Sequence, residues 1–314
     1  MLRKSTANII HLVDDQIKST IVLDGRRGVG KTTCLMQSIH HFAQKQWIVV
    51  PLMQISDWFS GIEPYEQLNA IFTQPTLSAK ILKTILLWNK KQMDSSLTAV
   101  AEEGIKNHLV ADNALETVLM TFVESNQRVL LAFDQFNALY SKTAYHDPSS
   151  AIITADKFFV ASLLHRIVGS ITPTGSMHRV SVLAGMDYTH PFHKSNYLEA
   201  ILRSTKPCNS DHGLLSHELS TFDFSNRDEF GIKLPKALDP LNGDLFASEA
   251  KDIPKPHVTR YIVPAYSQDE IKSVLEYYNK VSIIHSPPTD SFALKNWMVT
   301  QGNPLEVFKS FISV

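Results

Sequence analysis

One stretch decides the fold of this chain: Gly25-Arg26-Arg27-Gly28-Val29-Gly30-Lys31-Thr32. It matches the pattern G-x-x-x-x-G-K-[ST] at every defined position. The glycines permit positive φ angles and leave no side chain in the way, so consecutive backbone N–H groups can converge on phosphate oxygens. The stretch therefore predicts a loop that binds a nucleoside phosphate.

The side chains at the end of this loop complete the predicted site. We expect Lys31 to reach the β- and γ-phosphates as a positive charge, and the hydroxyl of Thr32 to bind Mg²⁺. A helix that starts at Lys31 points its positive end at the same anion, and Thr33 adds a hydroxyl near the α-phosphate. The predicted nucleotide-binding residues of this segment are Gly25, Gly28, Val29, Gly30, Lys31, Thr32 and Thr33.

The segments on both sides of the loop provide the context that the motif requires. Residues 19–24, Ser-Thr-Ile-Val-Leu-Asp, are apolar and β-branched, which predicts a buried strand. Residues 31–45 place Leu35, Ile39 and Phe42 at helical spacing. A chance match in a glycine-containing turn, the alternative interpretation, would need neither the strand nor the helix.

A second acid must hold the metal ion from the end of a neighbouring strand. Asp134 closes the apolar run of residues 128–134, and we predict that it is this acid, although an acid that merely starts a surface turn would give the same pattern. We therefore expect Mg²⁺ to be bound by Thr32 and Asp134, with Asp134 and Gln135 beside the nucleotide.

Gln135 indicates whether the site can activate a water molecule for nucleotide hydrolysis. In vigorous P-loop ATPases of the additional-strand type, a glutamate beside the metal-binding acid polarises the attacking water. An amide orients a water molecule but accepts no proton. The sequence thus predicts a protein that binds nucleotide stably and is at most a slow GTPase, with no catalytic residue. Asp187 and Thr189, after the next strand, would lie near the γ-phosphate, or form an ordinary turn.

The order of predicted elements gives the fold class. Strands over 47–53, 128–134 and 179–185 alternate with helices over 76–93, 113–124 and 154–168, and a polar connection separates the first two helices. This alternation is typical of an α/β fold with a mainly parallel, doubly wound sheet and helices on both faces, here of the P-loop NTPase (AAA+-like) type. Pro51 indicates an end or an edge and not the middle of the sheet.

The remaining third of the chain does not continue this regular alternation of strands and helices. Residues 204–256 lack periodicity, and a last strand over 260–263 precedes a helix over 268–281 and one or two more after residue 291. We expect a P-loop nucleotide-binding domain over 1–203, an irregular excursion with the last core strand over 204–263, and a C-terminal helical subdomain over 264–314.

Composition limits the function classes. The 314 residues carry 30 basic and 31 acidic side chains, a formal net charge of −1, so a protein that wraps nucleic acid is not indicated. Two cysteines far apart support no disulfide framework. No apolar run approaches the roughly 20 residues that span a bilayer. The basic N-terminus has no secretory apolar core, and it is too short for a mitochondrial presequence before the strand that begins about Thr20.

These features together resemble the death-associated protein 3 family, the GTP-binding protein of the mitochondrial small ribosomal subunit. The fragments that carry the resemblance, in this order and spacing, are Gln46-Trp47, Asp57-Trp58, Trp88-Asn89-Lys90, Leu97-x-x-Val100-x-x-Glu103-Gly104-Ile105, Asp134-x-x-Asn137-Ala138-Leu139, Val263-Pro264-x-Tyr266, Glu276-Tyr277-Tyr278 and Gly302-Asn303-Pro304. The resemblance covers nearly the whole chain. Family members generally carry a long segment before the phosphate loop, so we expect this chain to be shortened or mis-started.

The resemblance implies a structural component of the small-subunit head, bound to the ribosome in the mitochondrial matrix and taking part in mitochondrial translation. It implies bound GTP or GDP with Mg²⁺, contacts to other mitochondrial small-subunit ribosomal proteins, and local contacts to rRNA. The motifs alone do not exclude ATP. An active AAA+ or signal-transduction-type ATPase is the alternative, and it should have an acid at position 135. A kinase should have an arginine-rich lid within residues 204–256.

Overall fold

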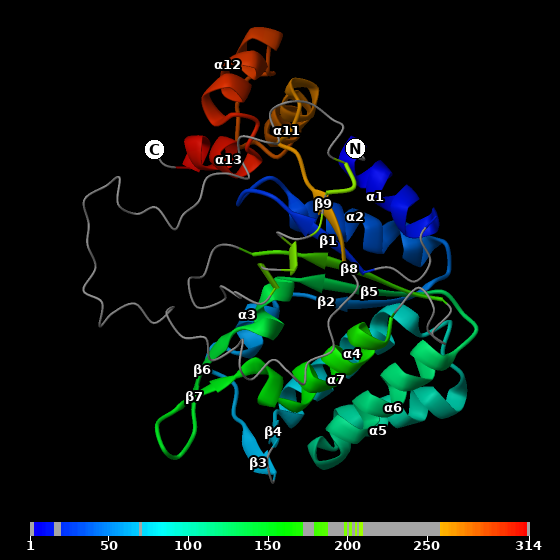
Figure 1. Ribbon diagram of the computed structural model, residues 1–314. Coiled ribbons are helices and arrows are strands. Elements are labelled where there is room, and N and C mark those ends of the chain that lie inside the picture. The colour runs from blue at the N-terminus through cyan, green and yellow to red at the C-terminus, as the bar shows by residue number, and fades with distance from the viewer. Residues whose placement is uncertain are drawn as a thin grey trace.

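A computed structural model describes residues 3–15, 20–68, 71–171, 179–187, 198–199, 201–202, 205, 207–209 and 258–312. Within these ranges the main sheet has five parallel strands in the order β2-β5-β8-β1-β9 (Figure 1). The strands are β1 Thr20–Asp24, β2 Ile48–Leu52, β5 Val129–Asp134, β8 Val180–Gly185 and β9 Val258–Ile262. The predicted parallel α/β sheet is confirmed, and Pro51 lies on the edge strand β2, as expected.

Helices cover both faces of the sheet (Figure 1). On one face lie α1 Lys4–Asp15 and α2 Lys31–Gln44, and on the other lie α4 Pro75–Asn89, α6 Ala111–Glu124 and α7 Phe159–Ser170. Alternate residues of a strand point to opposite faces. Accordingly Ile21 and Leu23 belong to the hydrophobic cluster under α1 and α2, whereas Val22 belongs to the cluster on the other face. The sheet is therefore doubly wound.

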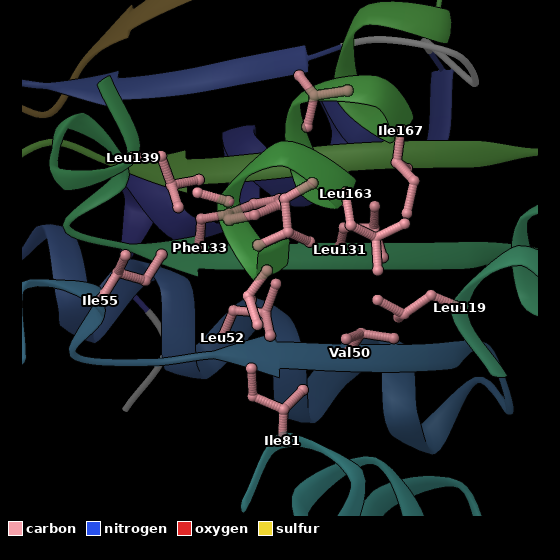
Figure 2. Packing of buried hydrophobic residues seen from close by; sticks show 14 of the residues in the cluster. Val50, Leu52, Ile55, Ile81, Leu119, Leu131, Phe133, Leu139, Leu163 and Ile167 are labelled. Atoms are coloured by element: carbon pink, nitrogen blue, oxygen red, sulfur yellow. The ribbon is translucent and has the colours of Figure 1, made fainter. Parts of the chain in front are cut away.

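The larger of the two clusters forms the main core (Figure 2). Strand residues Val50, Leu52, Leu131 and Phe133 line its sheet side, and all are fully or almost fully buried. Figure 2 shows the helix residues that pack on them: Ile81, Leu119, Leu163 and Ile167. This packing fixes the strand ends, and with them the residues that follow each strand.

Smaller elements surround the carboxyl ends of the strands. They are α3 Ile55–Trp58, the two-stranded sheet of β3 Glu66–Leu68 and β4 Ile71–Thr73, the 3-10 turn η2 Phe136–Tyr140, and the two-stranded sheet of β6 Lys142–His146 and β7 Ile152–Thr154.

The C-terminal helices form a unit with a core of its own. They are α11 Gln268–Lys280, α12 Asp290–Thr300 and α13 Pro304–Ile312, and their shared cluster contains Tyr266, Ile271, Leu275, Ala293 and Val307. A capping box joins Ser267 to Glu270 at the start of α11. Residues 264–312 are called the C-terminal helical unit below. The domain boundaries at 203 and 263 stay predictions.

Two sequence predictions were wrong in detail, and one helix was missed. The polar connection expected after residue 93 is largely a helix, α5 Ser95–Lys106, which packs against α4 and α6. The helix expected from Thr154 begins only at Phe159, because β7 ends at Thr154 and the 3-10 turn η3 Ala155–Lys157 follows. Helix α1 was not predicted at all.

Two further points concern the rest of the chain. Residues 210–257, most of the predicted excursion, lie outside the described residues. Among the helices that are described, none is both long and apolar enough to cross a membrane.

Candidate functional site

The predicted phosphate loop lies between the carboxyl end of β1 and the first turn of α2 (Figure 1). Strand β8 is inserted between β1 and β5, so the strand that leads into the loop and the strand that ends at Asp134 are one strand apart. In open parallel sheets, ligands bind at the carboxyl ends of the strands. The loop is at this position.

Two glycines give the loop its shape. Gly28 has φ +84° and Gly30 has φ +87°, values that side chains of L-residues rarely adopt. A Cβ on Gly28 would lie 2.4 Å from Oδ1 of Asn303, and a Cβ on Gly30 would lie 2.9 Å from the ring of Tyr266. Both positions therefore require glycine on conformational and on steric grounds.

Thr32 and Asp134 are brought together as the sequence predicted. The Thr32 hydroxyl donates to the Asp134 carboxylate, at 3.1 Å from Oδ1 and 3.3 Å from Oδ2. Thr32 is exposed, whereas Asp134 is buried at the end of β5. Hydroxyl and carboxylate oxygens are the ligands that Mg²⁺ prefers. The pair is thus a suitable start for a magnesium site.

Lys31 lies inside the loop. Its ammonium donates to the carbonyl of Gly25 at 2.6 Å and to that of Arg26 at 2.9 Å. Burial lowers the pKa of Lys31, while the nearby carboxylates Asp24, Asp187 and Asp134 act in the opposite direction. The ammonium is thus buried and donates hydrogen bonds to two carbonyls of the loop itself.

Asp187 adds a second acid beside Asp134. The Asn137 side chain exchanges two hydrogen bonds with the Asp187 backbone, donating to its carbonyl at 2.6 Å and accepting from its N–H at 2.9 Å. Burial raises the pKa of Asp134, and the charge of Asp187 raises it further. Thr189, which was expected near Asp187, lies outside the described residues.

This charge arrangement fits a divalent cation. The negative charges of the two carboxylates repel each other in a partly desolvated space. A cation between them and a phosphate would relieve this repulsion. Among the residues that the structure describes, no group of three or more His, Cys, Asp or Glu could hold a metal ion alone. A cation here would need phosphate oxygens to complete its ligands, which is typical of Mg²⁺.

Asp24, at the end of β1, is occupied by an ion pair. The Arg260 guanidinium on β9 donates to Asp24 Oδ2 through Nε at 2.8 Å and through Nη2 at 2.6 Å. Both side chains are largely buried, both guanidinium nitrogens contact the same carboxylate oxygen, and Oδ1 accepts from the Gly25 N–H at 2.7 Å. The pair fixes the start of the phosphate loop to the edge strand.

Gln135 has a constrained position. Its backbone is left-handed, with φ +64°. Its side-chain oxygen accepts hydrogen bonds from the backbone N–H of Ser56, at 3.1 Å, and from the Ser56 hydroxyl. The amide is therefore held toward the first turn of α3. It is adjacent to Asp134 along the chain, and its oxygen already has two donors.

The other predicted residues have neighbours that the sequence did not indicate. Val29 is buried, and its carbonyl accepts from Arg3 Nη1 at 2.7 Å. Thr33 is exposed, and its side chain lies near the Tyr266 hydroxyl. Asn303 Nδ2 donates to the Arg27 carbonyl at 2.9 Å.

Sequence reasoning missed Asp24, Arg260 and Arg3 as parts of this site. Asp24 directly precedes the glycine loop at the end of a buried strand, as Asp134 ends β5, and that signal was available. Arg260 lies 236 positions after Asp24, and its neighbours follow from the order of the strands. Arg3 lies 26 positions before Val29, just before the unpredicted helix α1.

Comparison with known proteins shows matches to one protein family. It matches the family model described as mitochondrial ribosomal death-associated protein 3 over residues 1–95 and 89–310. It is 26% identical to the small ribosomal subunit protein mS29 of Schizosaccharomyces pombe over 271 residues, covering 72% of this chain and 56% of the relative. It is 25% identical to the Bos taurus protein of the same name, covering 54% and 50%. The chain thus spans about half the length of the curated relatives it matches.

Among solved structures, the chain is similar to the Aeropyrum pernix ORC2 protein in its ADP form. The identity is 12%, the coverage 88% of this chain and 52% of the other, and the TM-score 0.35. At this TM-score the similarity carries no argument.

Proposed function

Because this chain belongs to the mitochondrial ribosomal death-associated protein 3 family, we propose that it is a structural component of the small subunit of the mitochondrial ribosome and that it binds a nucleoside phosphate with Mg²⁺. The family model covers nearly all of the chain. The relatives matched are small ribosomal subunit proteins by name. On this proposal the chain resides in the mitochondrion, where it takes part in translation.

One observation carries the nucleotide part of the proposal. The Thr32 hydroxyl lies 3.1 Å from Asp134 Oδ1, next to a loop whose glycines have left-handed φ angles. The residues that would hold the ligand are Gly25, Gly28, Val29, Gly30, Lys31, Thr32 and Thr33, with Asp134 and Thr32 toward the metal ion. When bound, Mg²⁺ would neutralise charge between the phosphates and the carboxylates.

Each part of the loop would have one task. The backbone N–H groups would donate to phosphate oxygens, and Lys31 would leave the carbonyls of Gly25 and Arg26 to pair with the phosphate chain. The first turn of α2 adds the positive end of its dipole. These contacts recognise phosphates and are independent of the base. GTP or GDP follows from the family, and ATP stays open.

The Gln135 side chain supports a nucleotide that is held and not turned over. An amide is no general base, and its oxygen already accepts two hydrogen bonds from Ser56. We infer that hydrolysis is slow or absent. Purified protein that hydrolyses nucleotide on the order of once per second, as ordinary ATPases do, would contradict this and favour an active ATPase.

The partners proposed are other small-subunit ribosomal proteins, with local contacts to rRNA. The formal net charge of −1 supports attachment mainly through proteins, because wrapping RNA calls for a clear basic surplus.

Two measurements on the natural protein test the proposal. Sedimentation of a mitochondrial lysate should place the chain with the small ribosomal subunit, whereas free oligomers without ribosomal proteins would contradict the ribosomal part. Mass spectrometry of the ligand released from gently purified protein should identify a nucleoside di- or triphosphate. Protein that is purified in folded form, carries no nucleotide and takes none up with Mg²⁺ would contradict the nucleotide part.

A further inference from the structure

Two carbonyls of the phosphate loop are held from outside by side chains from opposite ends of the chain. Arg3, just before α1, donates through Nη1 to the Val29 carbonyl at 2.7 Å. Asn303, between α12 and α13, donates through Nδ2 to the Arg27 carbonyl at 2.9 Å. Each of these carbonyls belongs to a residue that directly precedes a glycine, Arg27 before Gly28 and Val29 before Gly30.

These bonds determine where the next N–H groups point. In a trans peptide the C=O and the following N–H lie in one plane and point in opposite directions, and none of the described peptide bonds is cis. Because the Val29 carbonyl points to Arg3, the Gly30 N–H points away from Arg3. Because the Arg27 carbonyl points to Asn303, the Gly28 N–H points away from Asn303. A loop that binds phosphate needs such aligned N–H groups.

Arg3 is rigidly held. Its side chain is only 3% exposed. Besides Val29 it donates to the Pro264 carbonyl at 3.0 Å and to the Glu270 carboxylate at 3.4 Å, and its guanidinium lies 3.7 Å from the ring centroid of Tyr266. A planar group with contacts on all sides cannot swing aside without breaking several of them. The bond to Val29 is therefore a fixed restraint on the loop.

Asn303 links the loop to a helix start. While Nδ2 donates to Arg27, Oδ1 accepts from the N–H of Leu305 at 3.0 Å and of Glu306 at 3.4 Å in the first turn of α13. Gly28 has no space for a Cβ against this side chain. The Asn303 side-chain amide thus links the conformation of the loop to the position of the C-terminal helical unit.

We propose that Arg3 and Asn303 are positioning residues that set the phosphate loop in its binding conformation, and that the C-terminal helical unit is coupled to phosphate binding through them. The inference rests on the proposed nucleotide binding and adds the residues that prepare the loop. Coupling is reciprocal: an anion that favours the held loop must also favour the docked helical unit. The effect on binding should not depend on the base, because only phosphate-binding N–H groups are positioned.

Three variants of the full chain separate positioning from folding. Asn303→Ser keeps an oxygen that caps α13 but is too short to reach the Arg27 carbonyl. Arg3→Lys keeps the charge and loses the fork. Gln301→Ala is the matched control: Gln301 contacts the Arg26 side chain at 3.2 Å on the surface and holds no loop carbonyl.

The readouts are binding of Mg²⁺ with GDP and with ADP, and amide exchange in residues 301–306 with and without nucleotide. We expect Asn303→Ser and Arg3→Lys to weaken binding of both nucleotides about tenfold or more. A loss of this size corresponds to the net contribution of one hydrogen bond from a neutral or charged donor. Gln301→Ala should bind like the wild type. Nucleotide should slow exchange in 301–306 of the wild type but not of Asn303→Ser.

The outcomes distinguish the two proposals. If the wild type binds neither nucleotide, nucleotide binding and the positioning role both fall. If it binds one and a folded Asn303→Ser binds that nucleotide equally well, only the positioning role is overturned. Equal protection of 301–306 in both proteins would overturn the coupling. Should Arg3→Lys fail to fold, Asn303→Ser decides alone.

Discussion

The hydroxyl of Thr32 and the carboxylate of Asp134 lie 3.1 Å apart although 102 positions separate them in the chain. Thr32 lies in the first turn of α2, directly after the loop, and Asp134 is the last residue of β5. Parallel pairing of β1, β8 and β5 places both at the same edge of the sheet. The proposed metal site depends on this relationship.

Asp134→Asn should uncouple metal from nucleotide. The amide keeps the shape of the carboxylate and an oxygen for the Thr32 hydroxyl, but it removes the charge that would attract Mg²⁺. We expect the gain in nucleotide affinity that Mg²⁺ provides to fall at least about tenfold in the variant. Nucleotide titrations with Mg²⁺ and with EDTA measure this gain for each protein.

The same variant should not lose stability. Burial and Asp187 raise the pKa of Asp134, so the fold disfavours the charged form at neutral pH. The neutral amide removes that cost, and thermal unfolding should occur at an equal or higher temperature. An Asp134→Asn protein that keeps the full Mg²⁺ effect, or that unfolds several degrees lower, would contradict the assignment.

Gly30→Ala should damage both the fold and binding. The residue has φ +87°, and the new Cβ would meet the Tyr266 ring at 2.9 Å. We expect the free energy of unfolding to fall by about 2 to 4 kcal/mol, from the left-handed backbone and the overpacking together. Urea unfolding measures this loss.

Gly61→Ala is its matched control. Gly61 has φ +84°, but its Cβ would lie at 3.3 Å from the Ala144 methyl, and it is not part of the loop. Its cost should be about 1 to 2 kcal/mol, with nucleotide affinity unchanged. If both variants lose affinity equally, the loop is not the binding site.

Protonation of His165 should lower the free energy of unfolding as the pH falls below 6.5. Burial beside the Tyr140 ring, whose centroid is 4.5 Å away, lowers the pKa of His165 to about 4. In the unfolded chain His165 binds a proton near pH 6.5, but in the folded protein only near pH 4. The contribution of His165 to the free energy of unfolding is therefore fully present above pH 6.5 and is lost as the pH falls toward 4. By pH 5 the loss should be about 2 kcal/mol.

His165→Asn is the comparison that isolates this residue, because other groups also titrate. Urea unfolding at pH 7, 6 and 5 should show a steeper loss of stability for the wild type than for the variant. Parallel curves for the two proteins would show that His165 does not titrate as its burial implies.

The arrangement of the loop and Asp134 was predictable from sequence because its signals are local, whereas its role in binding nucleotide stays a prediction. The loop, the strand before it and the helix after it lie within about 25 residues, and Asp134 ends an uninterrupted apolar run. Backbone geometry alone demands glycine at positions 28 and 30. These features need no knowledge of the tertiary structure.

Helix α5 was missed because its inner face is small. Leu97, Ala101 and Gly104 are the buried residues, and a glycine usually argues against a helix. A Cβ on Gly104 would lie 2.6 Å from both Ala114 and Leu82, so glycine is required for close helix packing. Asp94 at the N-cap, which accepts from the Leu97 N–H, was the signal that indicated a helix.

Arg3 and Asn303 were beyond sequence reasoning for another reason. Their hydrogen bonds join positions 26 and 276 residues apart. No local pattern encodes such contacts, because they depend on where the packed sheet places α1 and the C-terminal helical unit. The Gly302-Asn303-Pro304 fragment carried family resemblance, but not its role at the loop.

Equilibrium binding of Mg²⁺ with GDP or ADP to Lys31→Ala tests the central claim most directly. Lys45→Ala, at an exposed position just after α2, is the control. The wild type and Lys45→Ala should bind alike, and Lys31→Ala should bind about a hundredfold more weakly, because on the proposed mode the Lys31 charge would pair with the phosphates. A folded Lys31→Ala protein that binds as tightly as the wild type would contradict a phosphate site in the loop of residues 25–32.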